Sequence, residues 1–426
     1  MTDKKNTPRS GFDRFRFDKT ICLGLEAAKF DNPRPIQVET IPAGLEGRDV
    51  LGLAQTGTGK TAAFALPILH YTLTERVRHE SPRALILAPT RELAAQIAEE
   101  IRLLGKFTRI NVATIFGGVS QFHQVNALKR RPEIIVGCPG RVLDLIDQNI
   151  LGLDEIETLV LDEADHMFDM GFLPDIRRIM AELPRDRQNL MFSATMPKEV
   201  RRLADEVLYQ PHVVELANSA PAATIDHELV LVAERRKREL LEHVLNGDSW
   251  HSAIVFTRTK HRAKRLAQQL SKLGHRAVGL QGNLSQGQRE RAMNGFRSRK
   301  FDILVATDIA ARGIDVSNVS HVINYDVPNT PEAYTHRIGR TGRSECEGQA
   351  CTFVTGADHS WLRATERMIG SPIQRRQIPG FEPDPEVLAA PVNRARGSRS
   401  GGRSQAAPSN RNQPTSRPQR RRRRTR

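Results

Sequence analysis

Short apolar runs alternate with longer amphipathic stretches along most of this chain, and this alternation constrains the fold more than any other feature. The apolar runs have the length of strands, and their Val, Ile and Leu residues follow one another with few polar interruptions. Strands of this kind are covered on both faces, as in a parallel sheet between two layers of helices. The predicted fold class is therefore α/β, with doubly wound parallel sheets. Strands are predicted in the first half at Val50–Ala54, Ala84–Ala88, Val112–Phe116, Ile134–Cys138, Leu159–Asp162 and Leu190–Phe192.

The pattern occurs as two series, and one irregular segment separates them. Residues 217–224, ANSAPAAT, contain small residues and a proline without periodicity, which is typical of a linker. A chain of 426 residues has room for two domains of about 100 to 200 residues and a tail. We predict a disordered leader (1–11), a first domain (12–216), a linker (217–224), a second domain (225–371), and an extension with an Arg-rich tail (372–426). Strands of the second series are predicted at Ala253–Thr257, Ala277–Gln281, Ile303–Thr307, Val322–Tyr325 and Cys351–Thr355.

Positive charge is concentrated near the end of the chain. The formal net charge is +15, and twelve arginines with no Asp or Glu lie between Val387 and Arg426, so the rest of the chain carries only +3. No aromatic residue follows Phe381, so base stacking cannot contribute and attraction to phosphates dominates. We predict a disordered tail that binds nucleic acid without sequence preference. A solubilising tail is the alternative.

The composition also limits the compartment and the kinds of site. The four cysteines form no CxxC pair and have no histidines at the spacing of a zinc site, so we predict reduced structural thiols. The sequence MTDKKNTPRS lacks an apolar signal core, and no segment approaches the ~18 apolar residues of a membrane span. We expect a cytoplasmic protein without a membrane anchor.

The strongest motif lies between the first predicted strand and a predicted helix. It is a P-loop in its usual context, although an alanine stands where the pattern has its first glycine. Glycines let backbone N–H groups approach the phosphates, Lys60 supplies a cation to the β and γ oxygens, and Thr61 offers a hydroxyl to Mg²⁺. The following helix adds its N-terminal dipole. The predicted nucleotide-binding residues are Ala54, Gln55, Thr56, Gly57, Thr58, Gly59, Lys60 and Thr61.

An acidic tetrapeptide, Asp162-Glu163-Ala164-Asp165, follows another apolar strand. Asp162 is predicted to hold Mg²⁺ directly or through water, and Glu163 to orient and deprotonate the water that attacks the γ-phosphate. Such a tetrapeptide alone is more often a solvated turn. The P-loop in the same chain favours the catalytic interpretation.

The second series contains the segment HRIGRTGR at residues 336–343, with arginines 337, 340 and 343 at intervals of three. In a helical turn they would share one side. Arg340 and Arg343 are predicted to face the γ-phosphate from the second domain, as arginine fingers that neutralise charge developing during hydrolysis. Catalysis would then require closure of the two domains. A basic patch that binds nucleic acid is the alternative.

Together these segments resemble the DEAD-box RNA helicases, a family with two RecA-like domains that bind ATP between them and RNA across both. The similarity covers roughly residues 12–370. The segment FDNPRPIQ, residues 30–37, resembles the family's Q motif, and the resemblance implies that Gln37 reads adenine. It places Phe12, Phe30 and Pro33 beside the nucleotide. The chain departs from the family's pattern at Lys29, commonly glycine, and Arg34, commonly Ser or Thr.

Further segments resemble the remaining helicase motifs, and the resemblance implies roles for their residues. RNA contacts of the first domain are implied for Pro89, Thr90, Arg91, Gly117, Gly118, Pro139, Gly140 and Arg141. Those of the second domain are implied for Thr257, Arg258, Arg289, Thr307 and Asp308, with Asp315 at the nucleotide ribose. Coupling of hydrolysis to strand separation is implied for Asp165, Ser193, Thr195 and His336. A plain helix cap is the other interpretation of residues 193–195.

The resemblance implies an ATP-dependent RNA helicase, with ATP and Mg²⁺ as cofactors, whose domains close on single-stranded RNA and open short duplexes. The chain looks most similar to the bacterial RhlE-type branch. We expect a monomer whose partner is RNA, single-stranded or duplex, with protein partners in ribosome assembly or RNA decay. Two alternatives remain: an RNA-binding or annealing protein that ATP regulates, and an ATPase acting on DNA, since basic contacts to phosphate do not distinguish the sugars.

Overall fold

The structure is a computed structural model that describes residues 11–54, 57–74, 81–216, 225–247, 250–311, 319–342 and 348–381. The predicted linker and Arg-rich tail lie outside these ranges, and so does the predicted leader up to residue 10. Four predicted site residues also lie outside them: Gln55, Thr56, Asp315 and Arg343.

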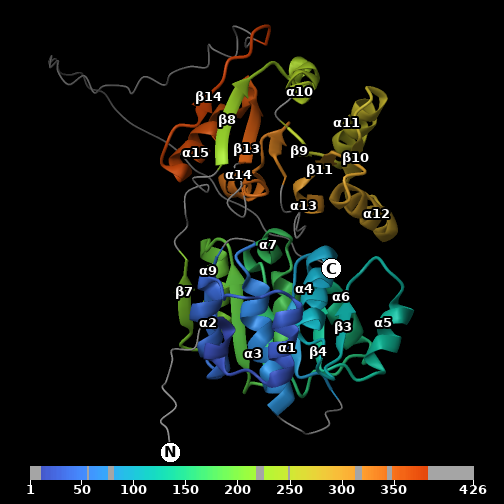
Figure 1. Ribbon diagram of the computed structural model, residues 1–426, viewed down its shortest axis with the longest axis vertical. Coiled ribbons are helices and arrows are strands. Elements are labelled where there is room, and N and C mark those ends of the chain that lie inside the picture. Colours follow the sequence, from blue (N-terminus) through green and yellow to red (C-terminus); the bar gives the residue numbers. More distant parts are fainter. Residues whose placement is uncertain are drawn as a thin grey trace, which may run out of the picture. The chain divides into compact units, whose positions relative to one another are not determined.

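A seven-stranded parallel sheet forms the first domain, with the order β3-β4-β2-β5-β6-β1-β7 (Figure 1). Its strands are β1 (Val50–Leu53), β2 (Ala84–Leu87), β3 (Val112–Ile115), β4 (Ile134–Gly137), β5 (Thr158–Leu161), β6 (Gln188–Ser193) and β7 (His212–Glu215). Its helices are η1 (Gly11–Phe15), α1 (Lys19–Ala27), α2 (Pro35–Leu45), α3 (Lys60–Thr74), α4 (Arg91–Leu104), α5 (Gln121–Leu128), α6 (Pro139–Asp147), α7 (Ala164–Asp169), α8 (Leu173–Ala181) and α9 (Lys198–Val207).

The second domain repeats this architecture, with the order β10-β11-β9-β12-β13-β8-β14. Its strands are β8 (Ile225–Leu231), β9 (Ala253–Phe256), β10 (Ala277–Leu280), β11 (Ile303–Ala306), β12 (His321–Asn324), β13 (Gly348–Val354) and β14 (Gln374–Arg375). Its helices are η2 (Glu234–Arg236), α10 (Lys237–Leu245), α11 (Lys260–Lys272), α12 (Gln286–Arg297), α13 (Asp308–Ala311), α14 (Pro331–Ile338), η3 (Gly356–Asp358) and α15 (His359–Ile369). If the strands of each sheet are numbered from one, both sheets have the same order, 3-4-2-5-6-1-7.

Apolar side chains fill both faces of each sheet, which is why most of its strands show no polar alternation. In the first domain, one core packs α1, α3 and α4 on one face, and a second core packs α6 to α9 on the other. The second domain likewise has one core under α12, α14 and α15 and another under α10 and α11. The predicted fold class, two tandem doubly wound domains of the RecA-like kind, is confirmed.

The predicted strands agree with the observed ones to within a few residues, but β7, β8 and β14 were not among them. β7 and β14 are edge strands, and β14 contains only two residues. It pairs with β8, and Ile373 and Ile378 beside it are buried. The segment after residue 371, predicted as an extension, therefore adds a strand to the sheet of the second domain.

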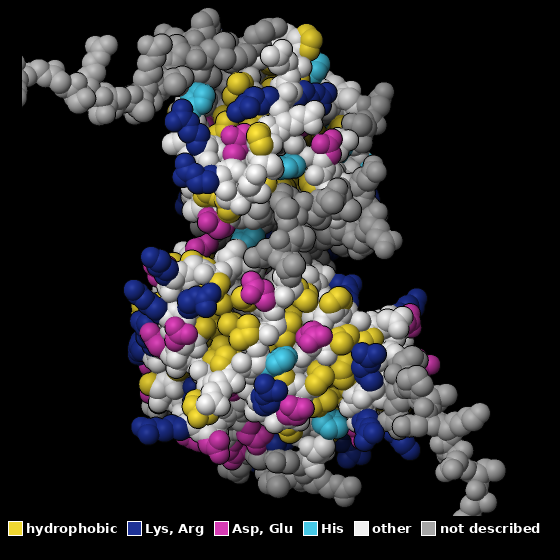
Figure 2. Space-filling view, turned by 90° about the vertical axis from the view of Figure 1, so that its left-hand side faces the viewer, with side chains coloured by type: hydrophobic (Ala, Val, Ile, Leu, Met, Phe, Trp, Pro, Cys, Tyr) yellow, Lys and Arg dark blue, Asp and Glu magenta, His cyan; other side chains and the backbone are white. Residues whose placement is uncertain are grey.

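The face of the first domain on the β7 side carries hydrophobic side chains among scattered charged ones (Figure 2). Tyr209 and Val213, beside and on the edge strand β7, are among its exposed apolar residues. In the described part of the chain, no helix is long and apolar enough to cross a membrane. Cys22, Cys138 and Cys351 are free thiols, as predicted, and Cys346 lies outside the described residues.

Candidate active site

The P-loop lies between β1 and α3, and a buried lysine, Lys60, begins α3. Gly57 and Gly59 have φ angles of 84° and 93°, in the left-handed region that favours glycine, so the loop needs glycine at both positions. Lys60, the first residue of α3, is 6% exposed, and its Nζ has no hydrogen-bond partner among the residues that the structure describes. The nearest carboxylate oxygen, Oδ1 of Asp162, is 4.0 Å away. A buried ammonium without a partner is costly, and a phosphate would supply the missing acceptors.

The predicted acidic residues lie at the carboxyl end of β5 and are buried, so the alternative of a solvated turn is wrong. Glu163 adopts the left-handed conformation, with φ 51° and ψ 52°, directly before α7. Its Oε2 lies 2.9 Å from Nδ1 of His166. Residues held in this conformation cost about 1 to 3 kcal/mol and cluster at functional sites. The left-handed backbone therefore gives the Glu163 side chain a different direction from the one it would have in an ordinary N-cap conformation.

The two neighbouring carboxylates have pKa values shifted in opposite directions. Burial raises the pKa of Asp162 to about 6, against the opposing effect of Lys60. Burial also tends to raise the pKa of Glu163, but the hydrogen bond and charge of His166 outweigh it and lower that pKa to about 2. Glu163 is therefore ionised at neutral pH, as a general base must be. His166 was not predicted from the sequence, although its i+3 spacing from Glu163 was an available signal.

Residues 193–195 connect the end of β6 to this acidic cluster. Oδ2 of Asp165 accepts hydrogen bonds from the backbone N–H and hydroxyl of Thr195, at 2.9 and 2.8 Å. The hydroxyl of Ser193 accepts from the N–H of Asp165 at 3.3 Å and donates to the carbonyl of Thr195 at 2.7 Å. The next helix, α9, begins only at Lys198, so the interpretation as a plain helix cap is wrong.

His336 of α14 contacts this cluster. Its Nδ1 lies 3.2 Å from Nε2 of His166. Burial lowers the pKa of His336 to about 4, and neighbouring His166 acts in the same direction. His336 is therefore neutral at pH 7. The predicted coupling residues Asp165, Ser193, Thr195 and His336 are thus brought together.

Residues of the predicted Q motif contact the P-loop. The amide of Gln37 donates to the carbonyl of Gly59 at 3.0 Å and accepts from the N–H of Arg34 at 2.8 Å. Arg34 donates through Nη1 to the carbonyl of Gly57 at 2.5 Å. An arginine at this N-cap position of α2 therefore loses the side-chain cap that Ser or Thr would provide, but gains a contact with the P-loop.

The aromatic residues of this motif pack together at the start of the chain's described part. Phe12 is buried, and its ring centroid lies 6.2 Å from that of Phe30. Pro33 is partly buried. Lys29, the other departure from the family pattern, has a φ of 58°. This left-handed value explains why glycine is common there.

The segments predicted to contact RNA in the first domain follow β2, β3 and β4, which are adjacent in the sheet. Thr90 caps α4, and Pro139 and Gly140 begin α6. The guanidinium of Arg91 packs so close to Gly118 that a β-carbon there would lie 2.0 Å from it. These helix N-termini present N–H groups at one end of the sheet, as anion-binding sites do. The P-loop follows β1, the acidic residues follow β5, and residues 193–195 lie at the end of β6, so these segments share the carboxyl ends of the other strands of the sheet.

Arg141 carries a donor without a partner at this edge. Its Nε pairs with Asp144 at 3.1 Å, but its Nη1 is buried and, within the described part of the chain, has no hydrogen-bond partner. Gly117 has open space around it. Both features leave room for a ligand with acceptor atoms.

In the second domain, the predicted residues lie beyond β9 and β11 around a buried arginine. Arg337 of α14 binds both carboxylate oxygens of Asp308, at 2.5 and 2.7 Å, and the carbonyl of Asp326 at 2.7 Å. α14 ends at Ile338. Arg337 therefore lies in the helix and Arg340 beyond its end, so the expectation that they share one side of a helical turn is wrong for these two arginines, and Arg343 lies outside the described residues. Arg340 is buried after the helix end.

Other predicted RNA contacts of the second domain differ in exposure. Arg258 is exposed and Thr307 is partly exposed, whereas the Thr257 side chain is fully buried. The Thr257 hydroxyl lies 3.4 Å from the carbonyl of Thr259. Arg289 is buried and pairs with Glu92 of the first domain at 2.6 Å.

The donor set fits Mg²⁺ bound together with phosphate. Among the described residues, no group of three or more His, Cys, Asp or Glu side chains could hold a metal by itself. Asp162 and the Thr61 hydroxyl next to Lys60 offer one carboxylate and one hydroxyl oxygen. Mg²⁺ commonly takes one or two protein oxygens and completes its shell with water and substrate phosphates.

Comparison with known families supports the same identification. Residues 34–203 match the DEAD/DEAH box helicase family, and residues 236–345 match the helicase conserved C-terminal domain. The ATP-dependent RNA helicase CshA of Listeria monocytogenes is 44% identical over 372 residues, which cover 87% of this chain and 71% of the relative. The DEAD-box ATP-dependent RNA helicase CshA of Bacillus subtilis is 43% identical over 374 residues, which cover 87% and 75%.

Solved structures agree in fold. Dbp5 of S. cerevisiae bound to RNA and ADP BeF3 has a TM-score of 0.77 at 34% identity, covering 86% of this chain and 96% of that one. Mss116p bound to ssRNA and AMP-PNP has a TM-score of 0.78 at 27% identity, covering 90% and 82%. The chain belongs to the DEAD-box family of ATP-dependent RNA helicases.

Proposed function

We propose that this chain hydrolyses ATP to drive closure of its two domains on single-stranded RNA, and that closure opens short RNA duplexes or remodels ribonucleoprotein. The observation that carries the proposal is the buried Nζ of Lys60, which lies 4.0 Å from Asp162 at the end of the sheet and has no hydrogen-bond partner among the described residues. A buried ammonium in this position is costly unless acceptors such as phosphate oxygens satisfy its N–H groups.

The first domain would supply the residues that bind ATP and the general base. N–H groups of residues 54–59 and the Lys60 ammonium hold the β and γ phosphates. The side-chain amide of Gln37 exchanges its hydrogen bond with Gly59 for one with the adenine. Mg²⁺, held by Asp162 and Thr61, would neutralise charge on the phosphates. Glu163 orients the attacking water and removes its proton. The contact with His166 keeps the carboxylate in place.

The second domain would supply the missing positive charge. Arg340 and Arg343 face the γ-phosphate when the domains close, and Asp315 binds the ribose. Arg340 already lies near enough for its charge to help lower the pKa of Glu163 against the effect of burial, after the larger contributions of His166 and Lys60. Neither domain alone holds a complete site.

RNA would lie along the carboxyl ends of β2, β3 and β4, beside the ATP site of the same sheet. The first domain contributes residues 89–91, 117–118 and 139–141, with the free Nη1 of Arg141 as a phosphate donor. The second domain contributes Arg258 and Thr307, and Arg289 once it leaves Glu92. Binding at the carboxyl ends of one sheet links RNA to the ATP site.

ATP turnover measured with no polymer, with single-stranded RNA and with single-stranded DNA tests this function. We expect stimulation by RNA of tenfold or more and little by DNA. Equal stimulation by DNA would favour the alternative of a DNA-dependent ATPase. The absence of any stimulation would contradict the proposal.

An RNA-annealing protein that ATP merely regulates is the second alternative. Glu163→Gln separates the two, because the variant should bind ATP without turnover. If it rearranged duplexes over many cycles as well as the parent, the binding function would replace the helicase function.

We also propose that the chain is of the RhlE-type branch, on the basic composition of its tail, although the relatives from Listeria monocytogenes and Bacillus subtilis are CshA proteins. We further propose domain bounds of 12–216 and 225–371, with an extension that adds β14 to the second sheet. A monomer in the cytoplasm, with a role in ribosome assembly or RNA decay, completes the proposal.

A further inference from the structure

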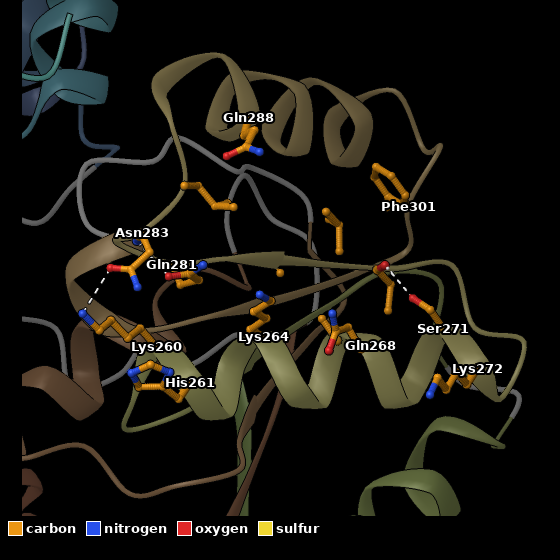
Figure 3. A pocket seen from close by; sticks show the side chains of 15 residues that line it. Lys260, His261, Lys264, Gln268, Ser271, Lys272, Gln281, Asn283, Gln288 and Phe301 are labelled. Carbon is orange, nitrogen blue, oxygen red and sulfur yellow. Dashed lines mark hydrogen bonds between the residues drawn. The ribbon is translucent and has the colours of Figure 1, made fainter.

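A groove of about 830 Å³ lies on the second domain, beside β10, the edge strand of its sheet (Figure 3). Its floor is β10, and helices α11 and α12 form its sides. Lys260 donates to Asn283 at 3.1 Å at one end, and the Ser271 hydroxyl donates to the carbonyl of Ala277 at 3.1 Å at the other. This volume falls in the range of ligand pockets.

The α11 side of the groove is positively charged. Lys260, Lys264 and Lys272 line it at spacings of four and eight residues, and all three are exposed. Residues four apart share one face of a helix, about 6 Å apart along its axis. None of the fifteen residues that line the groove is acidic. The groove therefore fits an anionic ligand.

The α12 side is more apolar. α11 and α12 lie on opposite faces of the sheet: α11 packs in the core with Ile303 and Val305, and α12 in the core with Leu304 and Ala306. Leu284 and Phe301 line the groove beside α12. Phe301 packs against Gly295, where a β-carbon would lie 2.6 Å from its ring. The two sides of the groove thus differ in chemistry.

The floor is a sheet edge. β10 is the terminal strand, and in the described part of the chain only β11 pairs with it. Val278 and Gly279 in its middle are partly exposed. An edge strand presents N–H and C=O groups that can pair with another chain.

We propose that this groove binds an extended segment of a partner protein, with alternating acidic and apolar residues, as an added strand beside β10. In an extended strand, every second side chain points to the same face, at a repeat of about 6.6 Å. This repeat matches the ~6 Å between lysines four apart. The acidic residues would face the lysines of α11, and the apolar ones would face Leu284 and Phe301.

Charge and hydrogen bonding select this occupant over two others. The chain's own tail is strongly cationic, so the lysines repel it. RNA carries the right charge, but its backbone has no N–H donors for the strand's carbonyls, whereas a peptide has both donors and acceptors. None of the residues that line the groove is proposed to bind or hydrolyse ATP, so the proposal does not depend on the proposed function.

Display selection against the full chain tests the proposal, with random twelve-residue peptides as the probe. We expect enriched peptides to carry net negative charge with acidic and apolar residues alternating. Their affinity should fall at least tenfold for the double variant Lys264→Glu, Lys272→Glu, and should be kept by the matched charge reversal Arg363→Glu on α15. Selection of peptides without that pattern, or equal binding to the double variant, would overturn the proposal.

Two further measurements separate strand addition from other modes and do not depend on the variants. The selected peptide should slow hydrogen exchange of residues 277–280, and N-methylation of its alternate amides should abolish binding. Unchanged exchange together with undisturbed binding of the methylated peptide would overturn strand addition. If the double variant instead lost tenfold in affinity for a 20-nucleotide single-stranded RNA while keeping the peptides, the groove would be an RNA track and the proposal would be wrong.

Discussion

The carboxylate of Asp165 is held by Thr195, which donates to Oδ2 through its backbone N–H at 2.9 Å and its hydroxyl at 2.8 Å. This pair joins the end of β6 to the acidic cluster after β5, two neighbouring strands of one sheet. A shift of Asp165 during hydrolysis would therefore move residues 193–195 as well. The pair thus links the acidic cluster of the ATP site to the segment that follows the next strand.

Thr195→Val should weaken this link while leaving the backbone hydrogen bond. A hydrogen bond to a charged group contributes about 1.5 to 3 kcal/mol, or roughly tenfold or more in an equilibrium. We expect duplex opened per ATP hydrolysed to fall about tenfold, with ATP turnover much less affected. Strand-separation and ATPase assays on the same sample measure this ratio. Thr195→Ser keeps the hydroxyl and should behave like the parent; an equal loss in both assays would argue against coupling.

Glu163→Gln should retain ATP binding and lose turnover. The amide keeps the size of the side chain but cannot accept the proton of the attacking water, and general-base catalysis contributes about 10² to 10⁴ in rate. Nucleotide affinity by fluorescence and turnover with saturating RNA would both be measured. Glu199→Gln on the exposed face of α9 serves as the matched control. Parent-like turnover would remove Glu163 from the proposed role.

Lys29→Gly should stabilise the first domain. Lys29 has a φ of 58°, and the left-handed conformation costs a residue with a β-carbon about 1 to 2 kcal/mol. Glycine adds unfolded-state entropy that offsets about 0.5 to 1 kcal/mol of this gain. We expect a net increase of up to about 1 kcal/mol in the free energy of unfolding, measured in urea. Lys29→Ala keeps the β-carbon and should give no increase; equal stabilities of the two variants would mean that φ is not the cause.

The buried thiols should be unreactive in the folded protein. Burial raises the pKa of Cys138 to about 12 and raises that of Cys351 further. At pH 8 only about one Cys138 thiol in ten thousand is ionised, and the fraction grows as pH rises toward the pKa. In a Cys346→Ser background, DTNB should label the partly exposed Cys22 first and the other two only in urea. Labelling of all three at one rate without denaturant would contradict this account.

Most of the fold was predictable because its strands are buried on both faces and therefore stand out as apolar runs. The missed strands lack that signal: β7 reads HVVE with alternating exposure, β8 (IDHELVL) has three polar residues after its first, and β14 has two exposed residues. Helix ends were harder to predict. α14 ends at Ile338, with Gly339 as its C-cap, so Arg340 lies beyond the helix. The spacing of three arginines could not reveal this end.

The site was predictable where its residues are close in sequence and less so where the fold assembles it. Residues 54–61 and 162–165 each form a local pattern with its own chemistry. The pairing of Arg337 with Asp308, 29 positions apart, depends on the order of strands in the sheet. The contact of His166 with His336, 170 positions apart, depends on both domains. Such pairs follow from topology rather than spacing.

The proposal that hydrolysis needs residues of both domains is tested by the ATP turnover of residues 1–216 alone. Circular dichroism would first establish that the fragment is folded. With saturating single-stranded RNA, we predict turnover at least a hundredfold below that of the full chain and no response to RNA, because the arginines of the second domain are missing. Turnover by the folded fragment at the rate of the full chain would contradict the claim.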